Sequence, residues 1–297
     1  MRVFLTGGTG LIGSAIVPEL INAGHQVLGL ARSDTSARAL LSAGAEVLMG
    51  NLEDLHTLSD GASRADGVIH CAFDLDFGNF EKSSQTERLA IAAFGTSLAG
   101  SDRPLIVSSG LGLGAPTRPI TEDVDAPAVS ASPRGPEQAA RLLREQGINV
   151  TVVRVPQVHN TVKQGLITSL IAVARQAGES AYVDEGLNCW PAAHVTDVAR
   201  LYRLALEKRE ASRYHAVGEE GIPLRDIAAA IGRGLKVPVT SISSEEAQAR
   251  FGRIGAYVGM DLSASSAWTR ERLGWMSTGP ALMEDLDRMR YFESSDT

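Results

Sequence analysis

A glycine-rich turn near the N-terminus constrains the fold more than any other feature of the sequence. The octapeptide TGGTGLIG spans residues 6–13, directly after the apolar run Val3–Leu5 and at the start of a helical pattern over Leu11–Ala23. A strand, a glycine turn and a helix in this order present free backbone N–H groups and the positive end of the helix dipole to a phosphate. In this spacing the three glycines make the tight turn, admit a pyrophosphate and let the helix pack closely on the strand. We therefore predict a bound dinucleotide, with contacts from Gly7, Thr9, Gly10, Leu11, Ile12 and Gly13.

Short apolar runs alternate with helical patterns through the first half of the chain. Apolar runs bounded by helices indicate a parallel sheet that is covered on both faces. Right-handed crossovers then produce a doubly wound α/β sheet of the Rossmann type, which binds ligands at the carboxyl ends of its strands. The predicted strands are Val3–Leu5, Gln26–Leu30, Glu46–Met49, Gly67–His70, Leu105–Val107 and Val150–Arg154, and the helices between them include Leu11–Ala23, Glu81–Leu98 and Glu137–Gln146.

The alternation loosens after about Pro156. We predict a Rossmann dinucleotide-binding lobe over residues 1–157 and a smaller substrate-binding lobe over residues 158–297. One or two segments, about residues 187–210, are expected to return to the first lobe. The patterns in this half are helical at Leu166–Ala177, Val195–Glu207 and Leu224–Leu235 and extended at Ser180–Val183 and Arg213–Val217.

Composition indicates which kinds of partner and which cellular compartment to expect. The formal net charge of −7 argues against a nucleic-acid partner, which needs a basic surface. No apolar run reaches the length of a membrane span, and Met1-Arg2 leads at once into the first strand without a signal peptide. Cys71 and Cys189 lie far apart and lack metal-ligand spacing, so we expect free thiols. These features predict a cytoplasmic protein that binds a small molecule and no metal, nucleic acid or membrane.

The end of the second strand favours NADP(H) over NAD(H). An NAD site places a carboxylate there for the ribose 2′-hydroxyl, roughly 20 residues after the glycines. This sequence has Ala31 at the expected position, followed by Arg32 and Ser33. A 2′-phosphate would meet a cation and a hydroxyl, and a charged hydrogen bond contributes about 1.5–3 kcal/mol. The alternative is that Arg32 is a solvated loop residue.

A series of short motifs follows the glycine turn in chain order. They are GNLED at 50–54, VIHCA at 68–72, VSSG at 107–110, RVPQVH at 154–159, WPAAHVTD at 190–197 and LGW at 273–275. Together with the TGxxGxxG spacing they resemble the extended and atypical short-chain dehydrogenases/reductases. That group includes sugar-nucleotide epimerases, dihydroflavonol reductases and carbonyl reductases.

The resemblance implies a place for each part of the cofactor. Asn51, which replaces the group's usual aspartate, and Leu52 would lie beside the adenine. Ser109 aligns with the active-site serine, and Pro156 would border the nicotinamide. Related proteins often dimerise through the helices that correspond to 81–98 and 137–146, so a homodimer is an expectation. The remaining implied cofactor contacts are Cys71, Ala72, Phe73, Ser108 and Val158.

The resemblance breaks at the catalytic pair. The group relies on Tyr-x-x-x-Lys, in which the tyrosine exchanges a proton with the carbonyl and the lysine lowers the tyrosine pKa. Here Arg134 occupies the tyrosine position and Gln138 the lysine position. None of the five tyrosines has a lysine four residues later: Tyr182, Tyr202, Tyr214, Tyr257 and Tyr291.

The leading hypothesis is a reductase with a changed proton donor. Its substrate would be the C=O or C=N bond of a small, largely apolar molecule. Arg134 would polarise a carbonyl or hold an acidic substrate, and Ser109 would donate a hydrogen bond to the same oxygen. His159 would supply the proton, unless it is a histidine packed against the second lobe. A protonated imine already carries its proton, so the missing tyrosine suggests imine as well as ketone reduction.

Two further hypotheses stay open. In the first, the protein binds NADP(H) without turnover, as a redox sensor or regulatory module, because losing general acid catalysis costs about 10²–10⁴-fold in rate. A substrate pocket speaks against this, lined by Phe73, Tyr182, Trp190 and His194, although each aromatic also suits core packing. The second is a sugar-nucleotide epimerase or dehydratase. It ranks last, since it needs a tightly held NAD and an acid–base tyrosine.

Overall fold

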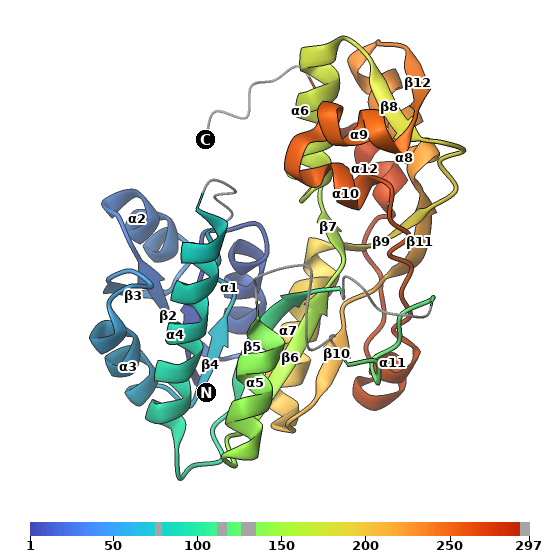
Figure 1. Ribbon diagram of the computed structural model, residues 1–297. Coiled ribbons are helices and arrows are strands. Elements are labelled where there is room, and N and C mark those ends of the chain that lie inside the picture. The colour runs from blue at the N-terminus through green and yellow to red at the C-terminus, as the bar shows by residue number, and fades with distance from the viewer. Residues whose placement is uncertain (75–78, 112–117, 126–134, 292–297) are drawn as a thin grey trace.

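The computed structural model describes residues 1–74, 79–111, 118–125 and 135–291 (Figure 1). Seven strands form its central sheet, in the order β10-β6-β5-β4-β1-β2-β3, and every neighbouring pair is parallel. The order runs outward in both directions from the β1–β4 pair, so the sheet is doubly wound and the predicted α/β fold is confirmed. The strands are β1 Arg2–Thr6, β2 Gln26–Ala31, β3 Glu46–Met49, β4 Gly67–His70, β5 Leu105–Gly110, β6 Val150–Val155 and β10 Arg213–His215.

Helices cover both faces of the sheet (Figure 1). One apolar core joins the sheet to α1, α2 and α7, and a second joins it to α3, α4 and α5. Buried positions in α4 recur every three or four residues, which is the pattern of a helix with one face on a core. The bounds are α1 Gly13–Asn22, α2 Asp34–Ser42, α3 Leu55–Ser63, α4 Phe80–Leu98, α5 Pro136–Glu145 and α7 Val195–Lys208.

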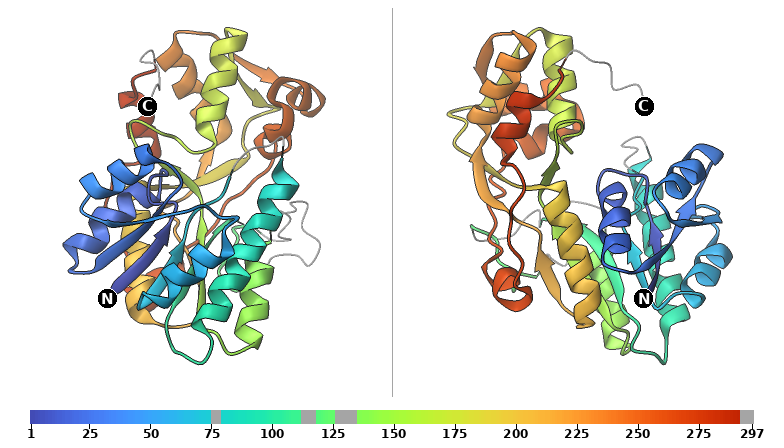
Figure 2. Two further views of the ribbon diagram at one scale, coloured as in Figure 1. Left: turned by 90° about the vertical axis from the view of Figure 1, so that its left-hand side faces the viewer. Right: turned by 180° about the vertical axis from the view of Figure 1, so that it is seen from behind.

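The rest of the chain builds a second lobe around its own apolar core (Figure 2). It contains a three-stranded sheet of order β11-β9-β7 and a parallel pair, β12-β8. The strands of the central sheet run upward in Figure 1, from the N-terminus near their foot, so their carboxyl ends face this lobe. Its strands are β7 Gln157–His159, β8 Ser180–Val183, β9 Cys189–His194, β11 Glu219–Pro223 and β12 Val239–Ile242, and its helices are α6 Ile167–Ala177, α8 Leu224–Leu235, α9 Ser244–Phe251, α10 Gly255–Val258 and α12 Leu282–Arg288.

The chain after β6 divides between the two halves. Helix α7 packs on α1 within the first core, and β10 pairs with β6 at the edge of the central sheet. A short helix, α11 (Ala267–Leu273), lies against β10. Segments far beyond residue 157 therefore complete the dinucleotide-binding half. Among the described helices, none is long and apolar enough to cross a bilayer.

Candidate active site

The glycine turn between β1 and α1 has a geometry that larger residues would disrupt. Gly7 has a φ of +76°, and a Cβ on it would lie 2.8 Å from the Ala72 backbone nitrogen, at the end of β4. A Cβ on Gly13 would lie 2.1 Å from the Gly7 carbonyl oxygen, and one on Gly10 would lie 3.3 Å from it. No described side chain caps the start of α1 at Ile12, and the Ser14 and Ala15 N–H groups donate to the backbone carbonyls of Gly10 and Ile12.

The residues after β2 leave a cation exposed. Ala31 is buried, whereas Arg32 is exposed and makes no ion pair or hydrogen bond with the described residues. Ser33 is the N-cap of α2, where its hydroxyl accepts a hydrogen bond from the Ser36 N–H over 3.3 Å. The Ser33 hydroxyl, predicted to contact a 2′-phosphate, thus caps α2 in this structure. The polar group of Arg32 is exposed to solvent.

Residues that end or follow β1, β3 and β4 lie at the same carboxyl edge of the sheet as the glycine turn. Asn51, after β3, accepts backbone hydrogen bonds from Glu53 and Asp54 over 2.8 and 3.2 Å, so it keeps the turn that the replaced aspartate would make. Thr6 Oγ1 lies 2.7 Å from His70 Nδ1 and accepts a hydrogen bond from the Ala72 N–H over 3.4 Å. The ends of β1 and β4 are therefore held together beneath the glycine turn.

The two serines near the end of β5 point to opposite faces of the sheet. Ser108 Oγ donates to the His70 carbonyl over 3.0 Å and accepts from the Tyr202 hydroxyl, on α7, over 2.7 Å. Ser109 Oγ donates to Glu137 Oε1, in the first turn of α5, over 3.0 Å. Ser108 thus links strands to a covering helix, and Ser109 lies between the end of β5 and the start of α5.

The carboxylate that accepts the hydrogen bond from Ser109 belongs to a buried ion pair between Glu137 and Arg154. Arg154 is 1% exposed, and its Nε and Nη2 donate to the two oxygens of Glu137 over 2.8 and 2.7 Å. Its Nη1 lies 3.2 Å from Nε2 of the buried His215, whose Nδ1 donates to the Ser265 carbonyl over 2.8 Å. Burial lowers the pKa of His215 to about 4, so the neutral ring accepts from the guanidinium. Sequence reasoning missed Glu137, although a charged residue in the apolar strand β6 signals a buried partner.

Residues 7–180, more than half of the chain, match a family described as NAD(P)H-binding. The chain belongs to this family. The predicted resemblance to extended short-chain dehydrogenases/reductases of the epimerase/dehydratase-like type is confirmed by this match and by the shared fold.

Three relatives align with three quarters or more of this chain. An uncharacterized protein of Schizosaccharomyces pombe is 42% identical over 295 residues, which is 98% of this chain and 100% of the relative. An uncharacterized protein of Saccharomyces cerevisiae is 41% identical over 294 residues, or 96% and 98% of the two chains. A 2-alkyl-3-oxoalkanoate reductase of Stenotrophomonas maltophilia is 25% identical over 246 residues, or 76% and 73%.

Solved structures of similar fold include epimerases. UDP-glucose 4-epimerase of Thermotoga maritima, solved with UDP-glucose, has a TM-score of 0.76 at 21% identity and covers 98% of both chains. UDP-glucose-4-epimerase of Stenotrophomonas maltophila, solved with bound NAD, has a TM-score of 0.76 at 19% identity and covers 98% of this chain and 97% of that one. At these identities the likeness concerns the fold.

The structure encloses the His159 side chain. This side chain is fully buried, and its Nδ1 lies 2.7 Å from Oδ2 of the buried Asp285, on α12. Burial lowers the pKa of His159, against the opposing effect of Asp285. This enclosed position suits the alternative of a histidine packed against the second lobe, and the proton-donor role of His159 stays a prediction.

The predicted substrate residues come from different elements. Trp190 is 1% exposed, lies in the second-lobe core and donates its Nε1–H to the Tyr257 carbonyl over 3.3 Å, so it is a core residue. Tyr182 is half-buried on β8, in the small β12-β8 sheet. His194 caps the start of α7 and lies beside His159, with 5.6 Å between ring centroids.

Other predicted residues lie near the sheet edge or outside the described ranges. Phe73 follows β4 and packs edge-to-face on Phe80, with 5.4 Å between ring centroids. Pro156 joins β6 to β7 and is half-buried, whereas Val158 is buried in the first core. Arg134 lies outside the described residues.

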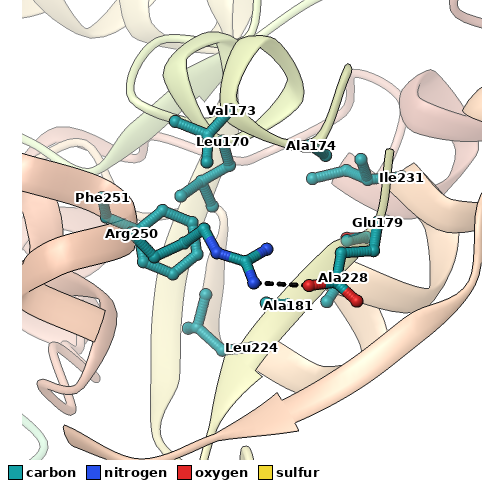
Figure 3. A pocket seen from close by; sticks show the side chains of 11 residues that line it. Leu170, Val173, Ala174, Glu179, Ala181, Leu224, Ala228, Ile231, Arg250 and Phe251 are labelled. Carbon is teal, nitrogen blue, oxygen red and sulfur yellow. Dashed lines mark hydrogen bonds and ion pairs between the residues drawn. The ribbon is translucent and has the colours of Figure 1, made fainter. Parts of the chain in front are cut away.

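A hollow in the second lobe is separate from this edge. It lies between α6, β8, α8 and α9, and its lining is mostly aliphatic (Figure 3). The Arg250 guanidinium reaches across it to a carboxylate oxygen of Glu179 (Figure 3). The ion pair occupies the polar part of the hollow, which makes it a packing feature of the lobe.

Proposed function

We propose that the protein is an NADP(H)-dependent oxidoreductase that reduces a C=O or C=N bond in a small, largely apolar molecule. One observation carries the proposal: the sheet order β5-β4-β1-β2 sets the glycine turn between Arg32 and Ser109. A dinucleotide laid across this edge would have its 2′-phosphate near Arg32, its pyrophosphate on the turn and its nicotinamide between Ser109 and Pro156. The reacting end would then face the second lobe.

The residues present suit such a cofactor. Gly7 and Gly13 allow close backbone contacts that a Cβ would block, which keeps the turn tight, and α1 starts without a side-chain cap. The exposed Arg32 would stabilise a 2′-phosphate by about 1.5–3 kcal/mol, a preference of about ten- to hundredfold for NADP(H). When bound, the nicotinamide supplies the hydride. The chain's own residues hold the phosphates, orient the ring and receive the substrate.

Reduction is favoured over epimerisation by two features. Ala31 and Arg32 suit NADP(H), whereas the epimerase hypothesis needs a tightly held NAD and a proton-exchanging tyrosine. The 2-alkyl-3-oxoalkanoate reductase, which aligns with about three quarters of the chain, supports reduction of an oxo group.

The free thiols of Cys71 and Cys189 suit the reducing cytoplasm that we propose as the compartment.

The test is NADPH oxidation, followed by absorbance, against a panel that pairs aldehydes and ketones with cyclic imines. Turnover of either class supports the reductase. Tight NADPH binding by fluorescence, without turnover of any member, would replace it with a redox sensor. One observation favours the sensor as second candidate: the Ser109 proton is donated to Glu137 and not toward the ligand side.

We also propose a homodimer through α4 and α5. The two helices pack side by side, and each exposes a leucine: Leu89 on α4 and Leu142 on α5, both 49% exposed. An exposed apolar side chain on each of two packed helices would suit a face that pairs with a second copy.

A further inference from the structure

The Ser109 hydroxyl carries a single proton and lies beside two acceptors of the protein itself. Its Oγ lies 3.0 Å from Glu137 Oε1 and 3.2 Å from the Gly110 carbonyl oxygen. A carbonyl oxygen accepts only, and so does an ionised carboxylate. The one proton of Ser109 is therefore committed to the protein, and the lone pairs of Oγ are what remain for a ligand.

Two arginines lie against the Glu137 carboxylate. Arg154 donates two hydrogen bonds to it, and Arg213 Nε lies 3.4 Å from its Oε2. The Glu137 side chain is 10% exposed and that of Arg154 is 1% exposed, so the carboxylate is the counter-charge of a buried guanidinium. His215 is neutral and accepts from Arg154, so it does not take over that role.

We propose that Ser109, oriented by Glu137, is a hydrogen-bond acceptor toward the ligand, so this site selects a ligand whose reacting heteroatom carries its own proton. Two ligand classes share this chemistry: the N–H of a protonated imine or amine, and the O–H of an alcohol. A neutral ketone offers Ser109 no proton. The inference rests on the proposed function for the placement of the ligand beside Ser109. In this arrangement Glu137 is a positioning residue.

The support from Glu137 strengthens the acceptor. A hydroxyl that donates to a carboxylate becomes more negative at oxygen, because hydrogen bonds in a chain polarise one another. A charged N–H donor gains more from such an acceptor than a neutral O–H donor does. We therefore expect protonated amines to bind more tightly than alcohols of equal size, and alcohols more tightly than ketones.

The experiment measures binding in complexes that cannot turn over. Cyclohexanol and protonated 2-methylpyrrolidine are titrated into the protein loaded with NADPH, and cyclohexanone into the protein loaded with NADP⁺, with dissociation constants from fluorescence. Ser109→Ala should weaken cyclohexanol about two- to tenfold and the amine about tenfold or more, and leave cyclohexanone unchanged. Glu145→Gln, an exposed change at the far end of α5, is the matched control and should change none of them.

A second variant tests the direction of the Ser109 proton. In Glu137→Gln the amide N–H₂ can donate to Ser109 and turn the serine proton outward, so cyclohexanone should gain affinity relative to cyclohexanol. If this variant fails to fold, Ser109→Ala still decides. Weaker cyclohexanone binding in Ser109→Ala, or no change for any probe, would overturn the inference. Wild-type protein that binds the probes as expected but turns over nothing would refute the reductase and leave the inference standing.

Discussion

Arg154, at the end of β6, donates hydrogen bonds to both carboxylate oxygens of Glu137, at the start of α5, over 2.8 and 2.7 Å. The pair ties the start of α5 to the strand beside β5, and Ser109 donates to the same carboxylate. The packing of α5 on β6 therefore depends on a pair of buried opposite charges.

Removing one partner of this pair should destabilise the fold. Arg154→Met leaves a buried carboxylate beside Arg213 alone, and breaking a buried pair costs about 3–5 kcal/mol. Arg64→Met is the control, because the Arg64–Asp60 pair is exposed and should contribute less than about 1 kcal/mol. Urea unfolding of both variants checks the difference. Equal, small losses would show that the buried pair adds little to stability.

Arg32 should set the cofactor preference. Arg32→Ala removes the exposed cation after β2, so affinity for NADPH should fall about ten- to hundredfold while affinity for NADH changes little. Fluorescence titration with both dinucleotides measures the ratio. Arg38→Ala, an exposed arginine on α2, serves as the control. A ratio that stays the same in Arg32→Ala would remove Arg32 from the cofactor site.

Stability should fall on mild acidification because of His215. Burial is the main cause that lowers its pKa to about 4, Arg154 lowers it further, and Glu122 and Glu137 oppose the shift. The unfolded chain, with an ordinary histidine near 6.5, takes up the proton first as the pH falls from 6.5 to 4. The free energy of unfolding should therefore drop across that window, by up to about 3 kcal/mol from this group.

Two variants separate His215 from other groups in the same window. His215→Gln should show a smaller drop in unfolding free energy between the two ends of the window, whereas His56→Gln, at an exposed position, should match the wild type. His159 acts in the same direction, because burial also lowers its pKa, so part of the drop should persist in His215→Gln. An unaltered drop in His215→Gln would assign the whole effect elsewhere.

The oligomeric state should depend on the exposed leucines of α4 and α5. Leu142→Asp places a charge in the proposed interface, so light scattering should report a monomer where the wild type is a dimer. Leu41→Asp, at a 59% exposed position on α2, is the control and should leave the mass unchanged. A wild-type mass equal to the chain mass would contradict the dimer at once.

Local chemistry was enough to predict the dinucleotide-binding half from sequence. Glycines at 7, 10 and 13 and short apolar strands act through backbone geometry and periodicity, which a linear pattern records. The strands at Glu46–Met49 and Gly67–His70 have the predicted bounds, and the other predicted strands of the central sheet differ by at most three residues at an end. The pattern did not predict β9, β11 or β12, and β12, with only four residues, carries little periodicity.

Only the tertiary structure decided the polar contacts of the site. The pattern marked Ser109 and His159 as candidates, but it contains no information about the partner of either side chain. The fold brings Glu137 to Ser109 and Asp285 to His159 across separations of 28 and 126 residues, and burial then sets which groups are charged. The sequence by itself determined the fold class and the place of the cofactor loop, because those depend on local geometry. Which side chain donates, accepts or is enclosed depends on distances across the fold and on exclusion of water, and those exist only once the chain has folded.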